Sequence, residues 1–133
     1  MPEQQFHDSV VAADRWSKVI ALFAAIGVFL IARELGADVQ FASIVAATAG
    51  IGTRLYIPYH ASVRLPEADR KPIHEHPTAG NYHHGTVGLG LVAASLGALA
   101  ASLIGHGFLN GVGVGCMSGV LGYVIFVRLL PSE

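Results

Sequence analysis

The feature of this sequence that most limits its fold is a run of 52 residues without a charged side chain, from His76 to Val127. A water-soluble domain of 133 residues has no interior that could bury such a run. A helical span of a bilayer needs about 20 apolar residues, so the run is long enough for two spans and a tight turn. Charged residues make up only 13% of the whole chain. The sequence therefore predicts an integral membrane protein.

Four apolar segments are separated by two short connections and one long one. The predicted transmembrane helices cover about residues 16–35, 39–57, 85–104 and 108–130. Because the connections at 36–38 and 105–107 are so short, the helices on either side of each must run antiparallel. Pro58 is expected to end the second helix, since an interior proline removes a backbone hydrogen bond. We expect an all-α membrane protein with a single transmembrane domain of four helices, arranged as two antiparallel hairpins and joined by a loop at 58–84 rich in histidine and proline.

The first apolar segment is interpreted as a retained helix rather than a cleaved signal peptide. Its leader contains Glu3, Asp8 and Asp14, whereas a signal peptide begins with a short basic region. Cleavage after Ala37 would also place Leu35 where a small residue is required.

The distribution of basic residues predicts the orientation in the membrane. Four spans place both termini and the long loop on one side. The Lys and Arg residues near the membrane on that side are Arg15, Lys18, Arg54, Arg64, Arg70, Lys71 and Arg128. The opposite side has only Arg33. Since cytoplasmic loops are enriched in Lys and Arg, we expect both termini and the loop to be cytoplasmic.

Arg54 lies one turn before Pro58, deeper in the predicted span than most other cations. We expect its guanidinium to reach the cytoplasmic interface or to pair with a loop carboxylate, Glu67 or Asp69. A role in binding an anionic substrate is the alternative.

Small residues recur at helical spacing in the last two predicted helices, which is the strongest motif in the sequence. Within lipid no hydrophobic force drives helices together, so their association depends on close backbone packing at small residues. The predicted packing positions are Gly107, Gly111, Gly115, Gly119, Gly97 and Ala101. They would pack the third helix on the fourth, or either helix on a neighbouring subunit. A glycine-lined solute path is less favoured, because the polar groups at mid-depth are mostly hydroxyls and the Cys116 thiol rather than ionisable groups.

Five histidines fall in the long loop and at its ends, where imidazole could bind a metal ion or respond to pH. The metal-ligand candidates are His74, His76, His83 and His84, although their spacing matches no established site. A docking surface for a partner or for lipid headgroups would use Arg54, His60, Arg64, Arg70, Lys71, His83 and His84. A simple interfacial loop at headgroup level is the alternative. No cofactor is predicted, since His84 and His106 would lie about 33 Å apart along one helix and could not share a haem.

The sequence contains no recognisable catalytic constellation, and its net charge of -1 argues against nucleic-acid binding. The favoured interpretation is a non-enzymatic structural or accessory subunit of a larger membrane assembly, such as a respiratory-type complex or a virion membrane, docking partners through the 58–84 loop. Its partners would be the lipid bilayer and other membrane subunits or further copies of itself. The alternatives are a small oligomeric channel or exporter and a metal-binding or redox protein that uses the loop histidines.

Overall fold

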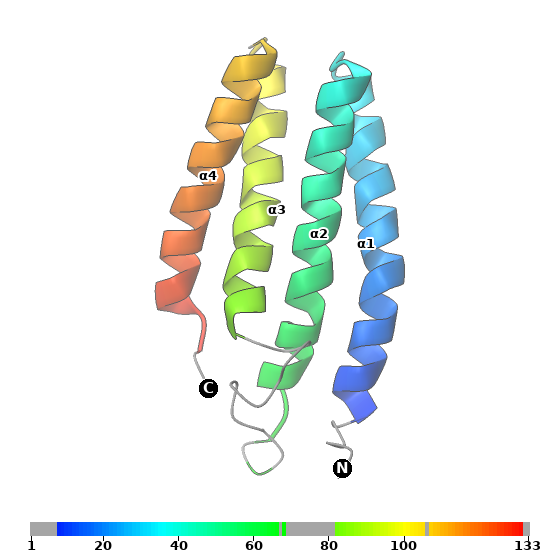
Figure 1. Ribbon diagram of the computed structural model, residues 1–133, viewed down its shortest axis with the longest axis vertical. Coiled ribbons are helices and arrows are strands. Elements are labelled where there is room, and N and C mark those ends of the chain that lie inside the picture. The colour runs from blue at the N-terminus through cyan, green and yellow to red at the C-terminus, as the bar shows by residue number, and fades with distance from the viewer. Residues whose placement is uncertain (1–7, 67, 69–81, 106, 132–133) are drawn as a thin grey trace.

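The computed structural model describes residues 8–66, 68, 82–105 and 107–131, and these form four α-helices and no strand (Figure 1). The helices are α1 (Asp8–Glu34), α2 (Val39–Val63), α3 (Tyr82–Leu103) and α4 (Phe108–Leu129). Each runs antiparallel to the one before it. One end of the molecule contains the turns at 35–38 and 104–107 and is called the hairpin end; the other, where α1 begins and α4 finishes, is called the terminal end.

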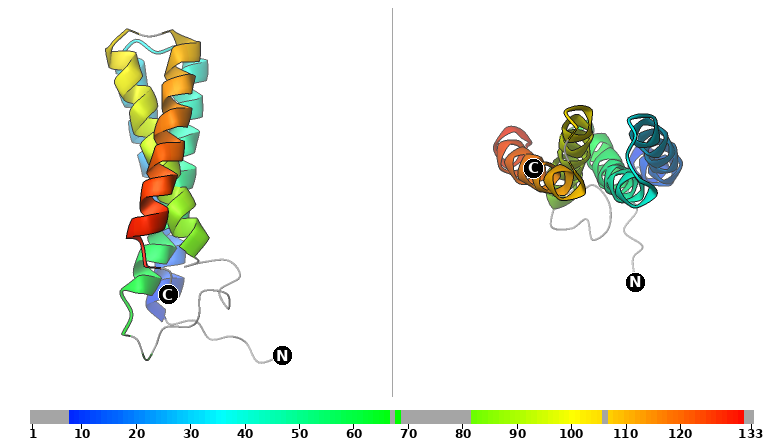
Figure 2. Two further views of the ribbon diagram at one scale, coloured as in Figure 1. Left: turned by 90° about the vertical axis from the view of Figure 1, so that its left-hand side faces the viewer. Right: turned by 90° about the horizontal axis from the view of Figure 1, so that it is seen from above.

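The helices form an open row rather than a closed bundle. Extensive contacts join α1 to α2, α2 to α3, and α3 to α4. Seen from above in Figure 2, the row zigzags, with α1 and α4 at opposite edges. The two inner helices therefore pack on both sides, whereas each outer helix packs on one side.

The turn between α1 and α2 is closed by a glycine and an aspartate. Gly36 has a φ of 85°, a conformation that side chains disfavour. The N–H of Ala37 bonds to the carbonyl of Ala32 and the N–H of Gly36 to that of Arg33, which is the Schellman pattern. The Asp38 carboxylate then accepts a hydrogen bond of 2.8 Å from the Phe41 N–H and caps α2. Backbone carbonyls at the end of α1 and a backbone N–H at the start of α2 are thereby hydrogen-bonded within a few residues.

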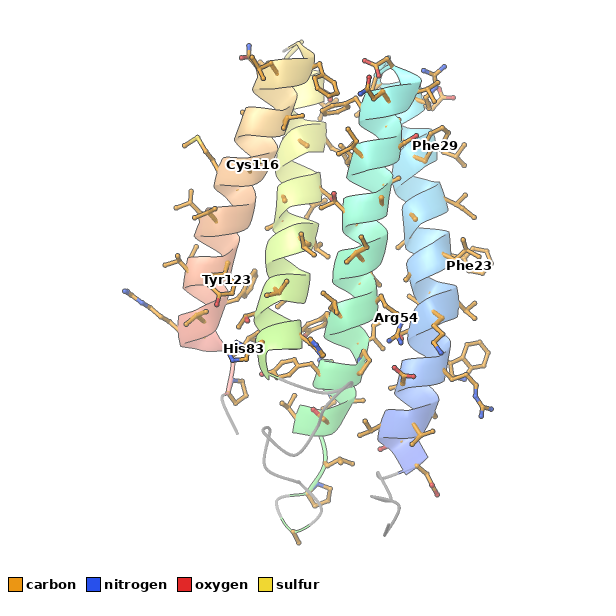
Figure 3. All side chains as sticks on the ribbon, viewed as in Figure 1. Phe23, Phe29, Arg54, His83, Cys116 and Tyr123 are labelled. Atoms are coloured by element: carbon orange, nitrogen blue, oxygen red, sulfur yellow. The ribbon has the colours of Figure 1, made fainter. Side chains whose placement is uncertain are left out.

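Three of the helices are long and apolar enough to cross a membrane: Asp8–Glu34, the segment His83–Leu103 of α3, and Phe108–Leu129. Large apolar side chains of the outer helices are exposed, among them Phe23 of α1 (Figure 3). Leu121 of α4 is another. Water-soluble monomers rarely expose so much apolar surface, whereas the hydrocarbon of a bilayer can cover it. This part of the fold is compatible with an integral membrane protein.

At the terminal end α1, α2 and α3 extend further than the predicted spans, and the expected end of α2 at Pro58 is wrong. α1 begins at Asp8, α3 begins at Tyr82, and α2 continues through Pro58 to Val63. Proline leaves the carbonyl one turn earlier without its helical partner. Two contacts hold the continuing turn in place. The buried Tyr59 ring packs against Gly85, and its hydroxyl donates a 2.8 Å hydrogen bond to the carbonyl of Pro131.

Candidate functional site

A charged cluster joins α1 to α2 near the terminal end. Nη2 of Arg54 lies 2.9 Å from Oδ1 of Asp14, and Nη1 donates a 2.7 Å hydrogen bond to the Ser17 hydroxyl. That hydroxyl, fully buried, donates in turn to the Asp14 carbonyl at 2.7 Å. The Arg54 and Asp14 side chains are each about one third exposed. The cluster therefore pairs a cation that would be costly to leave unpaired inside a bilayer.

Arg54 has a partner that the sequence did not suggest. We expected its guanidinium to reach the cytoplasmic interface or to pair with a loop carboxylate, and the structure shows an ion pair with Asp14, on the leader side of the first apolar segment. Glu67 and Asp69 lie outside the described residues. Because α1 starts at Asp8, Asp14 is already helical and stands beside Arg54. The pair forms because of how α1 and α2 are aligned along their axes. That alignment cannot be read from the sequence of either helix.

The histidines at the terminal end are spread over two helices. In α2, Nδ1 of His60 lies 3.0 Å from the Tyr56 hydroxyl, and the two rings are in contact. In α3, His83 is exposed and His84 is partly buried. Within the described residues, no three His, Cys, Asp or Glu side chains form a group that could hold a metal ion. His74, His76, Arg70 and Lys71 lie outside the described residues, and Arg64 is exposed at the C-cap of α2.

The predicted packing glycines of α4 have three different surroundings. Gly115 and Gly119 face α3, where an added Cβ would lie 3.1 Å from that of Ala98 and 2.9 Å from that of Ala94, respectively. Gly111 faces the ring of Phe41 in α2, and around Gly107 the space is open to 4 Å. On α3, Gly97 lies against Ser118 of α4, and Ala101 is 1% exposed.

Other close contacts escaped the sequence analysis. Gly52 and Gly88 cross at the α2–α3 interface, where a Cβ on either would lie within 2.7 Å of the other's carbonyl oxygen. Near the same interface, the Ser95 hydroxyl donates a 3.1 Å hydrogen bond to the carbonyl of Val45. Thr48, by contrast, donates to the carbonyl of Ile44 in its own helix. Glycine spacing identifies a face within one helix but does not identify its partner on another.

An apolar groove lies over α3, between α2 and α4, and has a volume of about 480 Å³. Its floor is made by α3 from Val87 to Ala98, and α4 forms one wall from Val112 to Tyr123. The other wall is the part of α2 nearest the hairpin end, from Phe41 to Thr48. This groove exists because the row of helices is open on that side, and we call it the α2–α4 groove.

The polar groups of the α2–α4 groove are few. The Thr48 and Ser95 hydroxyls both donate to backbone carbonyls. The other two polar side chains in the lining are Cys116, near the middle of the groove, and Tyr123, toward its terminal end. Such a lining suits a hydrocarbon occupant rather than an ion or a polar solute.

Comparison with protein families, with curated proteins and with solved structures found no match for this chain.

Proposed function

We propose that the chain is a multi-pass integral membrane protein in which all four helices span the bilayer. At 1.5 Å per residue, the 25 residues of α2 extend about 37 Å, more than the roughly 30 Å of the hydrocarbon core. α2 lies between α1 and α3, and its buried residues run from Phe41 to Ser62. Since neighbouring helices cover α2 on two sides, it can cross the bilayer without a segment as apolar as those of the other three helices.

The proposed orientation has both termini in the cytoplasm. The described Lys and Arg residues at the terminal end are Arg15, Lys18, Arg54, Arg64 and Arg128, whereas the hairpin end has Arg33. This asymmetry follows the excess of basic residues in cytoplasmic segments. It also places the 58–84 connection on the cytoplasmic side, where it would meet soluble parts of a partner.

We infer a non-catalytic role, as a structural or accessory subunit of a larger membrane assembly. The observation that supports it is the open row, in which each outer helix leaves most of its surface free for contact with lipid or other membrane helices. A closed bundle would instead bury one face of every helix against the others. The apolar lining of the α2–α4 groove gives no support to a channel formed by a single copy.

Gentle detergent extraction from the native source, followed by mass measurement of everything that co-purifies, tests this role. We expect the chain to be recovered in fixed stoichiometry with at least one other membrane protein. Substituting Arg64, Arg70 and Lys71 together by Gln should release that partner while the helices still insert. Gln at Arg33, on the opposite side, is the matched control and should release nothing. Recovery of this chain alone, together with solute flux into liposomes that contain it, would instead indicate a channel of several copies.

A further inference from the structure

The two hairpins differ in how much helix they have between charged residues. In the first, no Asp, Glu, Lys or Arg occurs from Val19 to Ala32 of α1 or from Val39 to Thr53 of α2. These stretches are about 21 Å and 22 Å long at 1.5 Å per residue. In the second, α3 contains no such residue and α4 contains none from Phe108 to Val127, a stretch of about 30 Å. Only the second hairpin therefore matches the roughly 30 Å hydrocarbon core of an ordinary bilayer.

The uncharged part of the first hairpin is shorter at its terminal end. The turns of both hairpins lie together at the hairpin end (Figure 1), so the uncharged stretches start at a common level. Contacts between α2 and α3 fix the level at which the stretch in α2 stops. A Cβ on Gly88 of α3 would lie 2.7 Å from the Gly52 carbonyl oxygen and 2.9 Å from the Tyr56 backbone nitrogen. Gly88 is therefore level with Arg54, which stands between those two residues on α2.

The second hairpin remains apolar beyond the level of Arg54. Two residues nearer the hairpin end on α3, a Cβ on Gly90 would lie between Gly119 and Tyr123 of α4. Because α3 and α4 are antiparallel, Arg54 is level with about Tyr123, and Figure 3 shows the two at similar heights. The first charged residue of α4 is Arg128, more than one turn past Tyr123 and roughly 7 Å further toward the terminal end.

The cation that ends the uncharged stretch of α2 is held in place. An arginine within hydrocarbon commonly extends its side chain along the helix toward the headgroups. The Arg54 guanidinium is instead bonded to Asp14 and Ser17, which keep it against α1. The Arg54 and Asp14 side chains are each about one third exposed. Hydrocarbon around these exposed parts would be costly, and a bilayer accommodates a short apolar segment by becoming thinner beside it.

We propose that the protein thins the terminal-end leaflet beside the first hairpin, by roughly 7 Å, so that headgroups and water lie at the level of Arg54. Beside the second hairpin the leaflet keeps its ordinary thickness. Arg15 and Lys18, both exposed on α1, would lie among the phosphates of the thinned leaflet. This inference rests on the proposed span of the bilayer by all four helices. It identifies the membrane that the protein fits as one whose phospholipids have short acyl chains.

Tryptophan fluorescence of the full chain tests the difference between the two hairpins. The chain has one tryptophan, Trp16, which adjoins Ser17 of the charged cluster and is 61% exposed. In vesicles of phosphatidylcholine brominated at known depths along its acyl chains, we expect Trp16 to be quenched most by the bromines nearest the headgroups. The second probe is Ile125→Trp in a chain with Trp16→Phe, because Ile125 lies between Tyr123 and Arg128 and is 51% exposed. We expect it to be quenched about 5 Å deeper, which is one helical turn.

The two depths distinguish failure of this inference from failure of the proposed function. Equal depths at the two positions would overturn the thinning and leave the membrane-spanning helices in place. Absence of quenching at both positions, with every brominated lipid, would overturn the thinning and the membrane span together.

Bilayer thickness provides a second test. In phosphatidylcholines with acyl chains of about 14 to 22 carbons, we expect the thermal stability of the full chain to be greatest toward the shorter lipids. Arg54→Leu, Asp14→Leu and Lys18→Leu together should move this maximum to longer lipids, because they lengthen the apolar part of the first hairpin. Arg128→Leu is the matched control and should leave the maximum unchanged, since the second hairpin already matches an ordinary bilayer.

Two results of the thickness series would overturn the proposal. One is a maximum at the longest lipids for the unaltered chain, and the other is an equal shift in the triple variant and in Arg128→Leu. If the triple variant does not fold, the stability of the unaltered chain and the two tryptophan depths still decide the outcome.

Discussion

The two hairpins of this protein are joined in different ways. In the first, the guanidinium of Arg54 on α2 binds Asp14 and Ser17 on α1 near the terminal end. In the second, Gly115 and Gly119 of α4 lie directly against the α3 backbone and its alanines through the middle of the helices. The first hairpin also has one close backbone approach, where Gly50 of α2 lies against Ala21 and Ala25 of α1. What distinguishes it is the directional, charged contact, whereas the second hairpin is joined by close packing over several turns.

In the proposed membrane arrangement, the difference follows from the surroundings of each contact, water and headgroups at the terminal end and hydrocarbon at mid-depth. A charged contact is tolerated near the headgroups, where water reaches the unsatisfied parts of each group. At mid-depth, helices surrounded by lipid gain from contact that is close enough for dispersion forces and backbone approach. Charge substitutions should therefore weaken the first hairpin, and changes of side-chain volume should weaken the second.

The largest effect is expected from Gly115→Leu in the second hairpin. A Cβ at Gly115 would already lie 3.1 Å from the Ala94 carbonyl oxygen and from the Ala98 Cβ, so the rest of the leucine side chain has no room. We expect a loss of about 3 kcal/mol in the free energy of unfolding, at the upper end for overpacked interiors. Thermal or denaturant unfolding in detergent, followed by circular dichroism, measures it.

Gly113→Leu is the control for this prediction. Gly113 lies two residues earlier on the same helix, and nothing stands within 4 Å of an added Cβ. Its replacement by leucine should leave stability unchanged or slightly raised, because leucine favours helix more than glycine does. Equal destabilisation by the two variants would show that helix propensity, rather than the α3–α4 contact, determines the result.

A smaller effect is expected in the first hairpin from removing its ion pair. Both side chains are about one third exposed, so the coupling between Arg54→Gln and Asp14→Asn should be about 1 kcal/mol, between surface and buried pairs. The measurement is a double-mutant cycle on unfolding in detergent. Because the contact is electrostatic, the coupling should fall as salt is raised.

Lys18→Gln is the matched control for the cycle. Nζ of Lys18 lies 4.0 Å from Oδ2 of Asp14 on the same helix, and the lysine side chain is 64% exposed. Its coupling to Asp14 should be a few tenths of a kcal/mol, as for other exposed pairs one turn apart. Equal coupling of Lys18 and Arg54 to Asp14 would show that the ion pair between α1 and α2 stabilises the protein no more than an exposed pair within one helix.

The same contrast explains what the sequence could predict. The apolar runs and short glycine turns predicted four helices in two hairpins, because hydropathy depends on local composition and a glycine turn on local geometry. The predicted ends at the hairpin end and the end of α4 agree with the structure within one residue. The start of α1, the end of α2 and the start of α3 were missed, since a helix can continue beyond its apolar segment as long as its backbone stays hydrogen-bonded. The continuation through Pro58 depends on Tyr59, which is fixed by Gly85 and Pro131 from other parts of the chain.

The contacts between helices were predictable only in part. The four-residue spacing of glycines on α4 identifies a narrow face, but not that Gly111 meets Phe41 while Gly115 meets α3. The crossing of Gly52 with Gly88, the Arg54–Asp14 pair and the α2–α4 groove all depend on how the helices are offset along their axes. That offset is a property of the packed molecule, and no single segment encodes it.

The smallest effect is expected where the two kinds of contact meet, at Ser95 between the hairpins. Its buried hydroxyl donates to the Val45 carbonyl across the α2–α3 interface. Ser95→Ala should lower unfolding free energy by about 0.6 kcal/mol, the average for hydrogen bonds between membrane helices. Ser43→Ala, whose exposed hydroxyl bonds to Val39 in its own helix, should change it by less. A larger loss at Ser43 would mean that directional polar contacts do not help join the hairpins at this depth, and close packing alone would account for the interface.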